Sequence, residues 1–174
     1  MIYYQDGRIT VRDLVFADAQ MITDGEIAQG WHQSVEKYLV RLEHQSQGTC
    51  ISLVAEYDGA VAGYINVYLK AKSGPFAPLE LPEIVDFGVL EKFRKKGIGT
   101  KLMDTAEEIA ARYADTVCLG VGLHSGYGSA QRMYVKRGYI PDGTGVWYRK
   151  NMCPPYGECC NDDHLVLYLS KKLK

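Results

Sequence analysis

The spacing of apolar residues predicts most of the secondary structure in the first half of the chain. Residues 9–12 alternate apolar and polar side chains and predict a strand. Asp18 is placed to cap a short helix through Ala19 and Ile22. A second helix is predicted after Ser34, because four residues repeat on one helical face: Val35, Tyr38, Leu39 and Leu42.

A hairpin is predicted next. Residues 50–57 and 60–69 are strand-like and flank Asp58-Gly59, a dipeptide suited to a type I′ turn. Strict alternation along the second arm predicts two faces. One face holds Val61, Ile65, Val67 and Leu69, and the other holds Ala62, Tyr64, Asn66 and Tyr68.

The second half alternates strands and helices after a loop rich in proline and glycine. Strands are predicted at residues 84–90, 116–121, 146–148 and 165–169. A helix begins near Gly97, with a buried stripe of Ile98, Leu102, Ala106, Ile109 and Tyr113, and a shorter helix holds Ala130, Met133 and Tyr134 and ends at Gly138. The order β-α-α-β-β-β-α-β-α-β-β predicts an α/β fold, a mixed and mostly antiparallel sheet flanked by helices.

Composition narrows the function classes. The 174 residues suit one domain spanning residues 1–174. A net charge of −1 without a basic stripe argues against a nucleic-acid partner. No apolar run is long enough to cross a bilayer, and the N-terminus lacks the zones of a signal peptide, so a cytoplasmic protein without a membrane partner is expected.

The cysteines do not predict a disulfide framework, because they are odd in number and scattered: Cys50, Cys118, Cys153, Cys159 and Cys160. Cys50 and Cys118 lie in apolar runs and are expected in the core. The other three, with His164 nearby, do not match the spacing of a zinc module, so no metal is expected. A flexible or substrate-contacting loop is the favoured interpretation.

The most informative stretch is the basic turn at residues 89–100. A strand runs into Arg94-Lys95-Lys96-Gly97-Ile98-Gly99-Thr100, where a helix begins. Helix N-termini present unpaired N–H groups to anions, and glycine lets the backbone approach a phosphate. The chemistry suits a pyrophosphate. A Walker A loop is excluded because Gly99-Thr100-Lys101 has the wrong order, and Gly120, Gly122 and Gly126 lack the dinucleotide spacing.

This turn resembles the acetyl-CoA signature of the GNAT superfamily of N-acetyltransferases. The later Ala130-x-x-Met133-Tyr134-x-Lys136-x-Gly138-Tyr139 resembles the second motif of that superfamily. The resemblance implies acetyl-CoA as co-substrate, with Val89 offering backbone groups to its pantetheine arm. The amides from Lys95 to Thr100 would hold the pyrophosphate, beside the charge of Arg94, Lys95 and Lys96. Three positions depart from the family pattern: Glu91, Lys95 and Tyr127.

The implied reaction moves an acetyl group from the thioester to a primary amine by direct attack in a ternary complex. An alkylamine with a pKa of ~10.4 is mostly protonated at neutral pH, so a general base is useful. Glu83 is ranked first as base, and Asp86 and His124 stay open. Glu83 would share a face with Val89 if the strand is regular. By resemblance, Tyr134 would protonate the departing CoA thiolate.

The acceptor is not specified by any motif, so small-molecule and peptide amines both stay open. Five aromatic residues are candidates for lining its pocket: Trp31, Tyr64, Tyr68, Trp147 and Tyr148. The resemblance also implies a homodimer. The alternative hypotheses are a non-catalytic acyl-CoA-binding sensor and a structural domain with a coincidental turn. The intact turn and tyrosine helix favour the enzyme.

Overall fold

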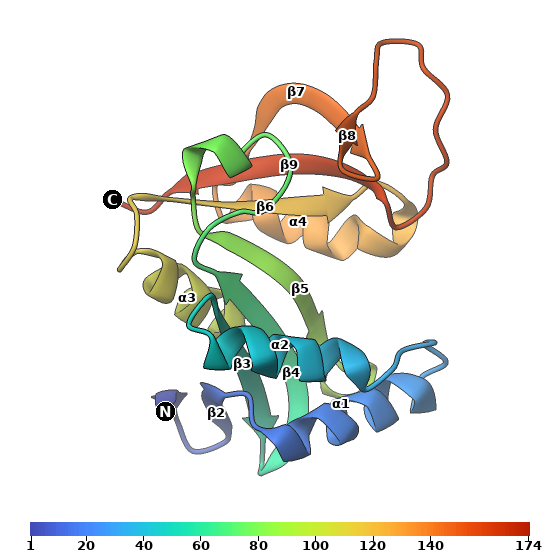
Figure 1. Cartoon of the computed structure of the whole chain (residues 1–174). Coiled ribbons are helices and arrows are strands. Elements are labelled where there is room, and N and C mark those ends of the chain that lie inside the picture. The colour runs from blue at the N-terminus through green and yellow to red at the C-terminus, as the bar shows by residue number, and fades with distance from the viewer. The chain divides into compact units, whose positions relative to one another are not determined.

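A computed structural model describes residues 1–174, and its elements follow the predicted order with two strands added, β1 and β8 (Figure 1). The chain divides into two compact units. The first comprises Met1–Tyr68 and Ile84–Ile109, and the second comprises Leu69–Glu83 and Ala110–Lys174. No helix is both long and apolar enough to span a membrane. The predicted fold class is confirmed, and the single-domain organisation stays a prediction.

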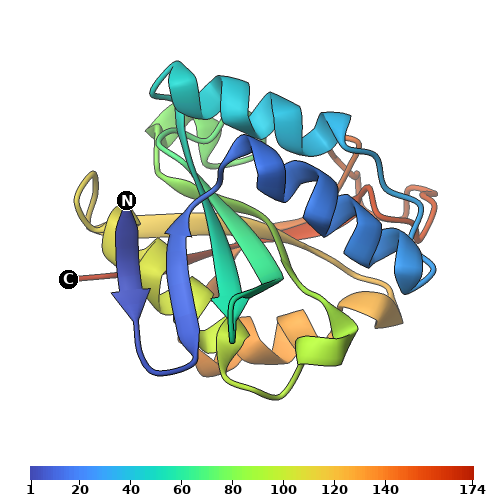
Figure 2. The same cartoon turned by 90° about the horizontal axis from the view of Figure 1, so that it is seen from below.

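The first unit contains five strands in sequential order: β1 (Ile2–Gln5), β2 (Ile9–Asp13), β3 (Cys50–Tyr57), β4 (Ala60–Tyr68) and β5 (Glu83–Val89). The pairs from β1 to β4 are antiparallel. Helices α1 (Phe16–Ala28) and α2 (Glu36–Ser46) cover one face of these strands, and α3 (Ile98–Ala110) covers the other (Figure 2). The α1 and α2 face buries a cluster of apolar and aromatic residues: Leu14, Ala19, Ile22, Tyr38, Val54 and Tyr64.

Helix α1 begins two residues before the predicted cap. Its N-cap is Val15, and Asp18 lies inside the first turn, where its carboxylate accepts the Val15 N–H at 2.8 Å. The same carboxylate receives two hydrogen bonds from Arg12, at 2.7 and 2.8 Å. Asp18 therefore caps the helix from within, which an acidic residue in the first turn can do.

The hairpin of β3 and β4 is confirmed, and Asp58 and Gly59 both have positive φ, at 50° and 79°, as a type I′ turn requires. The predicted faces of β4 are wrong at Val61. The register shifts so that Ala55 pairs with Gly63 and Glu56 with Val61. This bulge places Val61 against the same cluster as Tyr64.

The buried stripe of α3 is confirmed for Ile98, Leu102, Ala106 and Ile109, each at most 1% exposed. Tyr113 is not part of it. The helix ends at Ala110, and Tyr113 lies beyond it with 52% of its surface exposed.

The second unit holds four strands in the order β6 (Thr116–Gly122), β9 (Leu165–Lys172), β7 (Ile140–Tyr148) and β8 (Asn151–Met152), all antiparallel. Helix α4 (Gly128–Lys136) lies beside β6 and β9 (Figure 1). Gly138 has φ 88° and ends this helix as predicted. Cys118 is buried with Ala71, Phe76 and Tyr168, and Cys50 is buried in the first unit, so both are core cysteines.

Candidate functional site

Leu90 joins β5 to the basic turn and is held in place by its neighbours. The Leu90 N–H donates to the Ala62 carbonyl at 2.9 Å, and the Leu90 side chain is 3% exposed. Gly25 of α1 makes room for it, because a Cβ there would come within 2.6 Å of Leu90 Cδ1. A short 3₁₀ turn, Glu91–Phe93, then leads to Arg94. The end of β5 is thus fixed against both β4 and α1.

Two left-handed residues shape the turn itself. Lys95 has φ 61° and Gly97 has φ 82°. The first backbone hydrogen bond of α3 runs from the Lys101 N–H to the Gly97 carbonyl, at 3.1 Å. The N–H groups of Ile98, Gly99 and Thr100 precede that bond and have no partner within the helix.

A ligand can come close to the backbone at the start of α3, because the two glycines there have no side chains. Ile98 is 1% exposed and anchors the first turn. A Cβ on Gly97 would meet no atom within 4 Å, whereas one on Gly99 would lie 3.2 Å from the Phe87 ring. The arrangement has the open backbone and free N–H groups that an anion-binding helix N-terminus requires, and phosphate binding there stays a prediction.

Two of the three basic side chains of the turn contact neighbouring side chains. The Arg94 guanidinium lies 5.9 Å from the centre of the Trp31 ring and 3.4 Å from Glu91 Oε1. The Lys96 ammonium lies over the Tyr57 ring, at 4.6 Å. Because Arg94 and Lys96 already contact these neighbours, the backbone amides are better placed than these two side chains to bind an anion.

Strand β5 is irregular at Asp86, which has φ 57°. The Asn66 side-chain amide donates to the carbonyl oxygens of both Val85 and Asp86, at 3.2 Å each. Consecutive carbonyls of a regular strand point in opposite directions, so this shared donor marks a local break. The assumption of regular alternation from Glu83 to Val89 is therefore wrong.

The carboxylate of Asp86 faces α2. It lies 3.1 Å from the Lys37 ammonium and 3.7 Å from the Arg41 guanidinium. Arg41 also hydrogen-bonds the Tyr68 hydroxyl, which contacts His44 Nδ1 at 2.7 Å. These two cations make Asp86 a weaker candidate for the general base than Glu83.

Glu26 was not predicted as a site residue, yet it is fully buried beside this network. Its two carboxylate oxygens accept hydrogen bonds from Tyr38 and Tyr64, each at 2.7 Å, and Lys37 lies 3.8 Å away. Burial raises the pKa of both tyrosines well above the ordinary value. The signal in the sequence is its spacing, because Glu26 follows the buried Ile22 by four residues on the inner face of α1.

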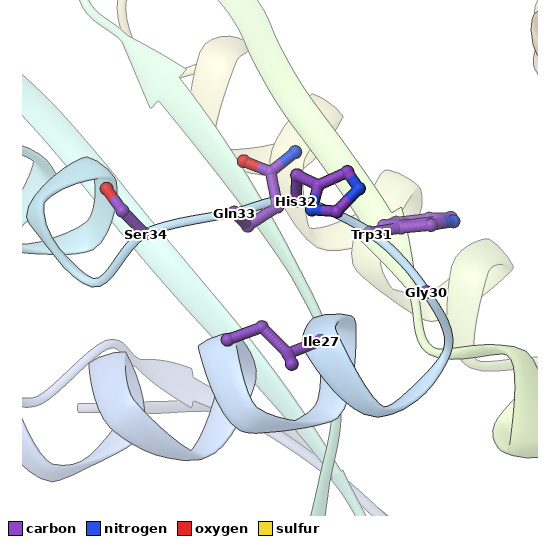
Figure 3. Close-up of a pocket in the computed structure, with 6 residues that line it drawn as sticks. All are labelled: Ile27, Gly30, Trp31, His32, Gln33 and Ser34. Atoms are coloured by element: carbon purple, nitrogen blue, oxygen red, sulfur yellow. The ribbon is translucent and has the colours of Figure 1, made fainter.

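An open hollow of about 540 Å³ lies at the segment that joins α1 to α2 (Figure 3). Ile27 comes from the last turn of α1, and the other lining residues come from the linker: Gly30, Trp31, His32, Gln33 and Ser34. Trp31 also contacts Arg94, as described above, so the hollow adjoins the basic turn. Of the five predicted aromatic residues, only Trp31 lines it.

Tyr134 lies in α4 of the second unit and is 6% exposed. Its ring packs edge-on to Tyr139, with 5.7 Å between centres. Its hydroxyl makes no hydrogen bond, which is unusual for a buried tyrosine. Burial raises its pKa to about 12, so the hydroxyl keeps its proton at neutral pH.

Glu83 begins β5 and belongs to the second unit, where the preceding carbonyl of Pro82 accepts the Cys118 N–H at 2.9 Å. Burial raises the pKa of Glu83 to about 7, and the charge of Lys150 opposes this only in part. A carboxyl group with that pKa exchanges protons readily near neutral pH.

His124 is already engaged on both ring nitrogens. Nε2 lies 2.9 Å from Asp163 Oδ1, and Nδ1 accepts the Gly126 N–H at 3.1 Å. These bonds assign the proton to Nε2 and leave no free lone pair for a substrate. Nor do three His, Cys, Asp or Glu side chains gather anywhere in the chain to hold a metal ion.

Comparison with known proteins confirms the family resemblance seen in the sequence. The model of the Acetyltransferase (GNAT) family matches residues 17–139, which include segments of both units. An uncharacterized N-acetyltransferase of Chlorobaculum tepidum is 29% identical over 157 residues, covering 86% of this chain and 90% of the relative.

Solved structures share the fold at low identity. The Salmonella typhimurium protein yncA, solved with its cofactor acetyl-CoA, has a TM-score of 0.67 and 18% identity, covering 97% of this chain and 95% of its own. A Salmonella typhimurium acetyl transferase that modifies the N-terminal serine of ribosomal protein L7/L12 has a TM-score of 0.72 and 10% identity, covering 99% of both chains. Ard1 of Thermoplasma volcanium has a TM-score of 0.68 and 19% identity, covering 95% of this chain and 97% of its own.

Proposed function

This chain belongs to the GNAT acetyltransferase family and is an N-acetyltransferase with acetyl-CoA as co-substrate, and we propose that its turn from Arg94 to Thr100 holds the pyrophosphate. The observation that carries this proposal is the left-handed backbone at Lys95 and Gly97, followed by the three N–H groups that precede the first bond of α3. Val89, at the end of β5, would present backbone groups to the pantetheine arm.

Two groups would move protons. Glu83 takes the proton of the attacking amine, because its pKa of about 7 leaves much of it ionised at neutral pH yet basic enough to accept. Tyr134 gives its proton to the CoA thiolate as the carbon–sulfur bond breaks. The pKa of about 12 and the absence of a hydrogen bond to its hydroxyl support this role.

The acceptor in this proposal is a primary amine on a small molecule or a peptide, and it attacks the thioester directly in a ternary complex. The hollow beside Trp31 supplies room for its body. Residues 1–174 would act as one domain, since a single family model runs through segments of both units. A cytoplasmic location and a homodimer belong to the same proposal.

Two measurements test these assignments. Calorimetry measures the binding of acetyl-CoA, and detection of the released CoA thiol measures turnover on a panel of amines. We expect binding, turnover on one amine class, and a fall in kcat of about 10²-fold or more for Tyr134→Phe with acetyl-CoA affinity preserved. Tyr113→Phe, an exposed tyrosine outside the proposed site, is the control. An unchanged kcat in Tyr134→Phe would contradict the role of Tyr134 as the general acid. Failure of the protein to bind acetyl-CoA would contradict the role of the turn in binding pyrophosphate.

A further inference from the structure

The C-terminal end of α1 contacts the segment that leads into the basic turn, and both belong to the first unit. Gly25 and Gln29 are four residues apart, so they lie on the same side of the helix. A Cβ on Gly25 would come within 2.6 Å of Leu90 Cδ1. The Gln29 side-chain oxygen accepts the Glu91 N–H at 2.9 Å. Two consecutive residues after β5 are therefore held by one side of α1.

The backbone of Gln29 is itself fixed by the way in which α1 ends. Gly30 has φ 85°, and its N–H donates to the Ile27 carbonyl at 2.9 Å. The Trp31 N–H donates to the Glu26 carbonyl, also at 2.9 Å. These two bonds around a left-handed glycine form a Schellman motif, which satisfies the last carbonyls of a helix. The Gln29 side chain therefore extends from a well-defined helix end.

A short 3₁₀ turn links the position of Glu91 to that of Arg94. The Phe93 N–H donates to the Leu90 carbonyl at 2.9 Å, and the Arg94 N–H donates to the Glu91 carbonyl at 3.1 Å. The Arg94 guanidinium lies 5.9 Å from the centre of the Trp31 ring. The segment from Glu91 to Arg94 is thus attached at both of its ends to the residues that end α1.

The side-chain amide of Gln29 acts through its oxygen alone. The Glu91 N–H is a donor, so only the oxygen of the amide can accept it. The nitrogen Nε2 is buried and makes no hydrogen bond. A buried donor without a partner costs free energy, so the stability of the fold alone does not explain why this side chain lies here.

We propose that Gln29 is a positioning residue for acetyl-CoA. Its side-chain oxygen holds Glu91 and, through the 3₁₀ turn, keeps the backbone from Lys95 to Thr100 in the conformation that binds the pyrophosphate. Without this bond the segment is less ordered, and part of the binding free energy is then spent on ordering it. The inference rests on the proposed function of the basic turn, and Gln29 acts through the Glu91 amide.

Gln29→Met tests the inference, because methionine has a similar length and lacks the oxygen acceptor. Since Nε2 makes no hydrogen bond, the substitution removes only the bond to Glu91. We expect the dissociation constant of acetyl-CoA, measured by calorimetry on the whole protein, to rise about three- to tenfold, as the loss of one hydrogen bond predicts. In steady-state kinetics the change falls on the KM for acetyl-CoA and not on kcat.

Hydrogen exchange of the ligand-free protein provides a second measurement. We expect the Glu91 amide to exchange at least about threefold faster in Gln29→Met than in the wild type. Gln20→Met is the matched control, because Gln20 lies in the same helix and its amide bonds the Asp24 carboxylate on the surface, at 2.7 Å. In this control, affinity and exchange should both stay within about twofold of the wild type.

The outcomes separate the inference from the proposed function. Faster exchange at Glu91 with unchanged acetyl-CoA affinity would overturn the inference, because the bond would then support the fold and not the cofactor site. An unchanged exchange rate, or an equal loss of affinity in Gln20→Met, would overturn it too. In each of these cases the wild type still binds acetyl-CoA. A wild type that fails to bind acetyl-CoA would instead contradict the role of the basic turn, and the inference would fall with it.

Discussion

The side-chain amide of Asn66 donates to the main-chain carbonyl of Asp86 at 3.2 Å, and the same amide serves the carbonyl of Val85. Asn66 is 3% exposed, so no solvent molecule readily replaces it. The left-handed φ of 57° at Asp86 is costly for a residue with a side chain. The neighbouring strand β4 thus stabilises the break in β5, from which the Asp86 carboxylate reaches Lys37.

Asn66→Ala should destabilise the protein. It leaves two carbonyl oxygens without their donor, so we expect the free energy of unfolding to fall by about 1–3 kcal/mol in chemical denaturation. Asn151→Ala is the matched control, because Asn151 makes one exposed bond to the Arg149 carbonyl, at 3.0 Å. A change of about 0.5 kcal/mol or less is expected there. Equal losses in both variants would contradict the stabilising role of Asn66.

The buried carboxylate of Glu26 predicts coupling between two tyrosines. Tyr38→Phe and Tyr64→Phe each remove a hydrogen bond to the Glu26 carboxylate, and Tyr64→Phe also removes the acceptor of a hydrogen bond from Lys37, at 3.2 Å. Each substitution should cost about 1.5–3 kcal/mol of stability. The double variant leaves Glu26 with only Lys37 nearby, at 3.8 Å. We therefore expect its loss to exceed the sum of the single losses by at least about 0.5 kcal/mol.

Urea denaturation of the four proteins in this cycle measures the coupling. Tyr4→Phe serves as the control, because the Tyr4 hydroxyl bonds Asp6 on the surface, at 2.8 Å. Strict additivity of Tyr38→Phe and Tyr64→Phe would mean that the two hydroxyls act independently of each other and are not coupled through Glu26.

Features set by neighbouring residues were predictable from the sequence. The Asp58-Gly59 hairpin and Gly97 depend on backbone conformations that few residue types adopt, so the local sequence alone indicates them. The stripe of α3 is predictable for a similar reason, since helical spacing puts its apolar residues on one face.

Features set by contacts between distant segments were not predictable. The break at Asp86 depends on Asn66, twenty residues earlier in the chain, and no local pattern reveals it. The bulge that turns Val61 toward Tyr64 is fixed by the register with β3. Likewise, the sequence already ranks Glu83 ahead of Asp86 as the base, but it does not reveal that Lys37 and Arg41 face Asp86. The sequence was enough to identify the residues of the basic turn, whereas the structure was needed to identify the groups around Glu83 and Asp86.

The two left-handed residues of the basic turn should respond oppositely to substitution. Lys95→Gly removes the steric cost of a side chain at a positive φ, so it should raise the free energy of unfolding by up to about 1 kcal/mol. Gly97→Ala adds that steric cost and should lower the free energy of unfolding by about 1–2 kcal/mol. Gly97 has open space around its Cβ position, so φ alone causes that loss. If backbone amides bind the pyrophosphate, Lys95→Gly keeps acetyl-CoA affinity within about tenfold by calorimetry. A larger loss would assign the binding to the lysine side chain.

The raised pKa of Glu83 predicts how the stability of the protein depends on pH, and this prediction can be tested without measuring catalysis. The folded protein holds this proton up to a pKa of about 7, whereas the ordinary glutamate value is 4.5. Between these values the folded state binds more protons than the unfolded state, so the contribution of Glu83 to stability declines as the pH rises. Glu83→Gln cannot ionise and lacks this decline.

Thermal and urea unfolding of wild type and Glu83→Gln at pH 5 and pH 8 measure the effect. From pH 5 to pH 8, we expect the free energy of unfolding of Glu83→Gln to rise relative to that of the wild type by up to about 3 kcal/mol. The full difference is reached above pH 7. Glu80→Gln, an exposed glutamate in an ion pair with Lys70, is the control and should show no such gain. A pH-independent difference for Glu83→Gln would mean that the carboxyl is ionised normally, and it would then lose its support as the general base.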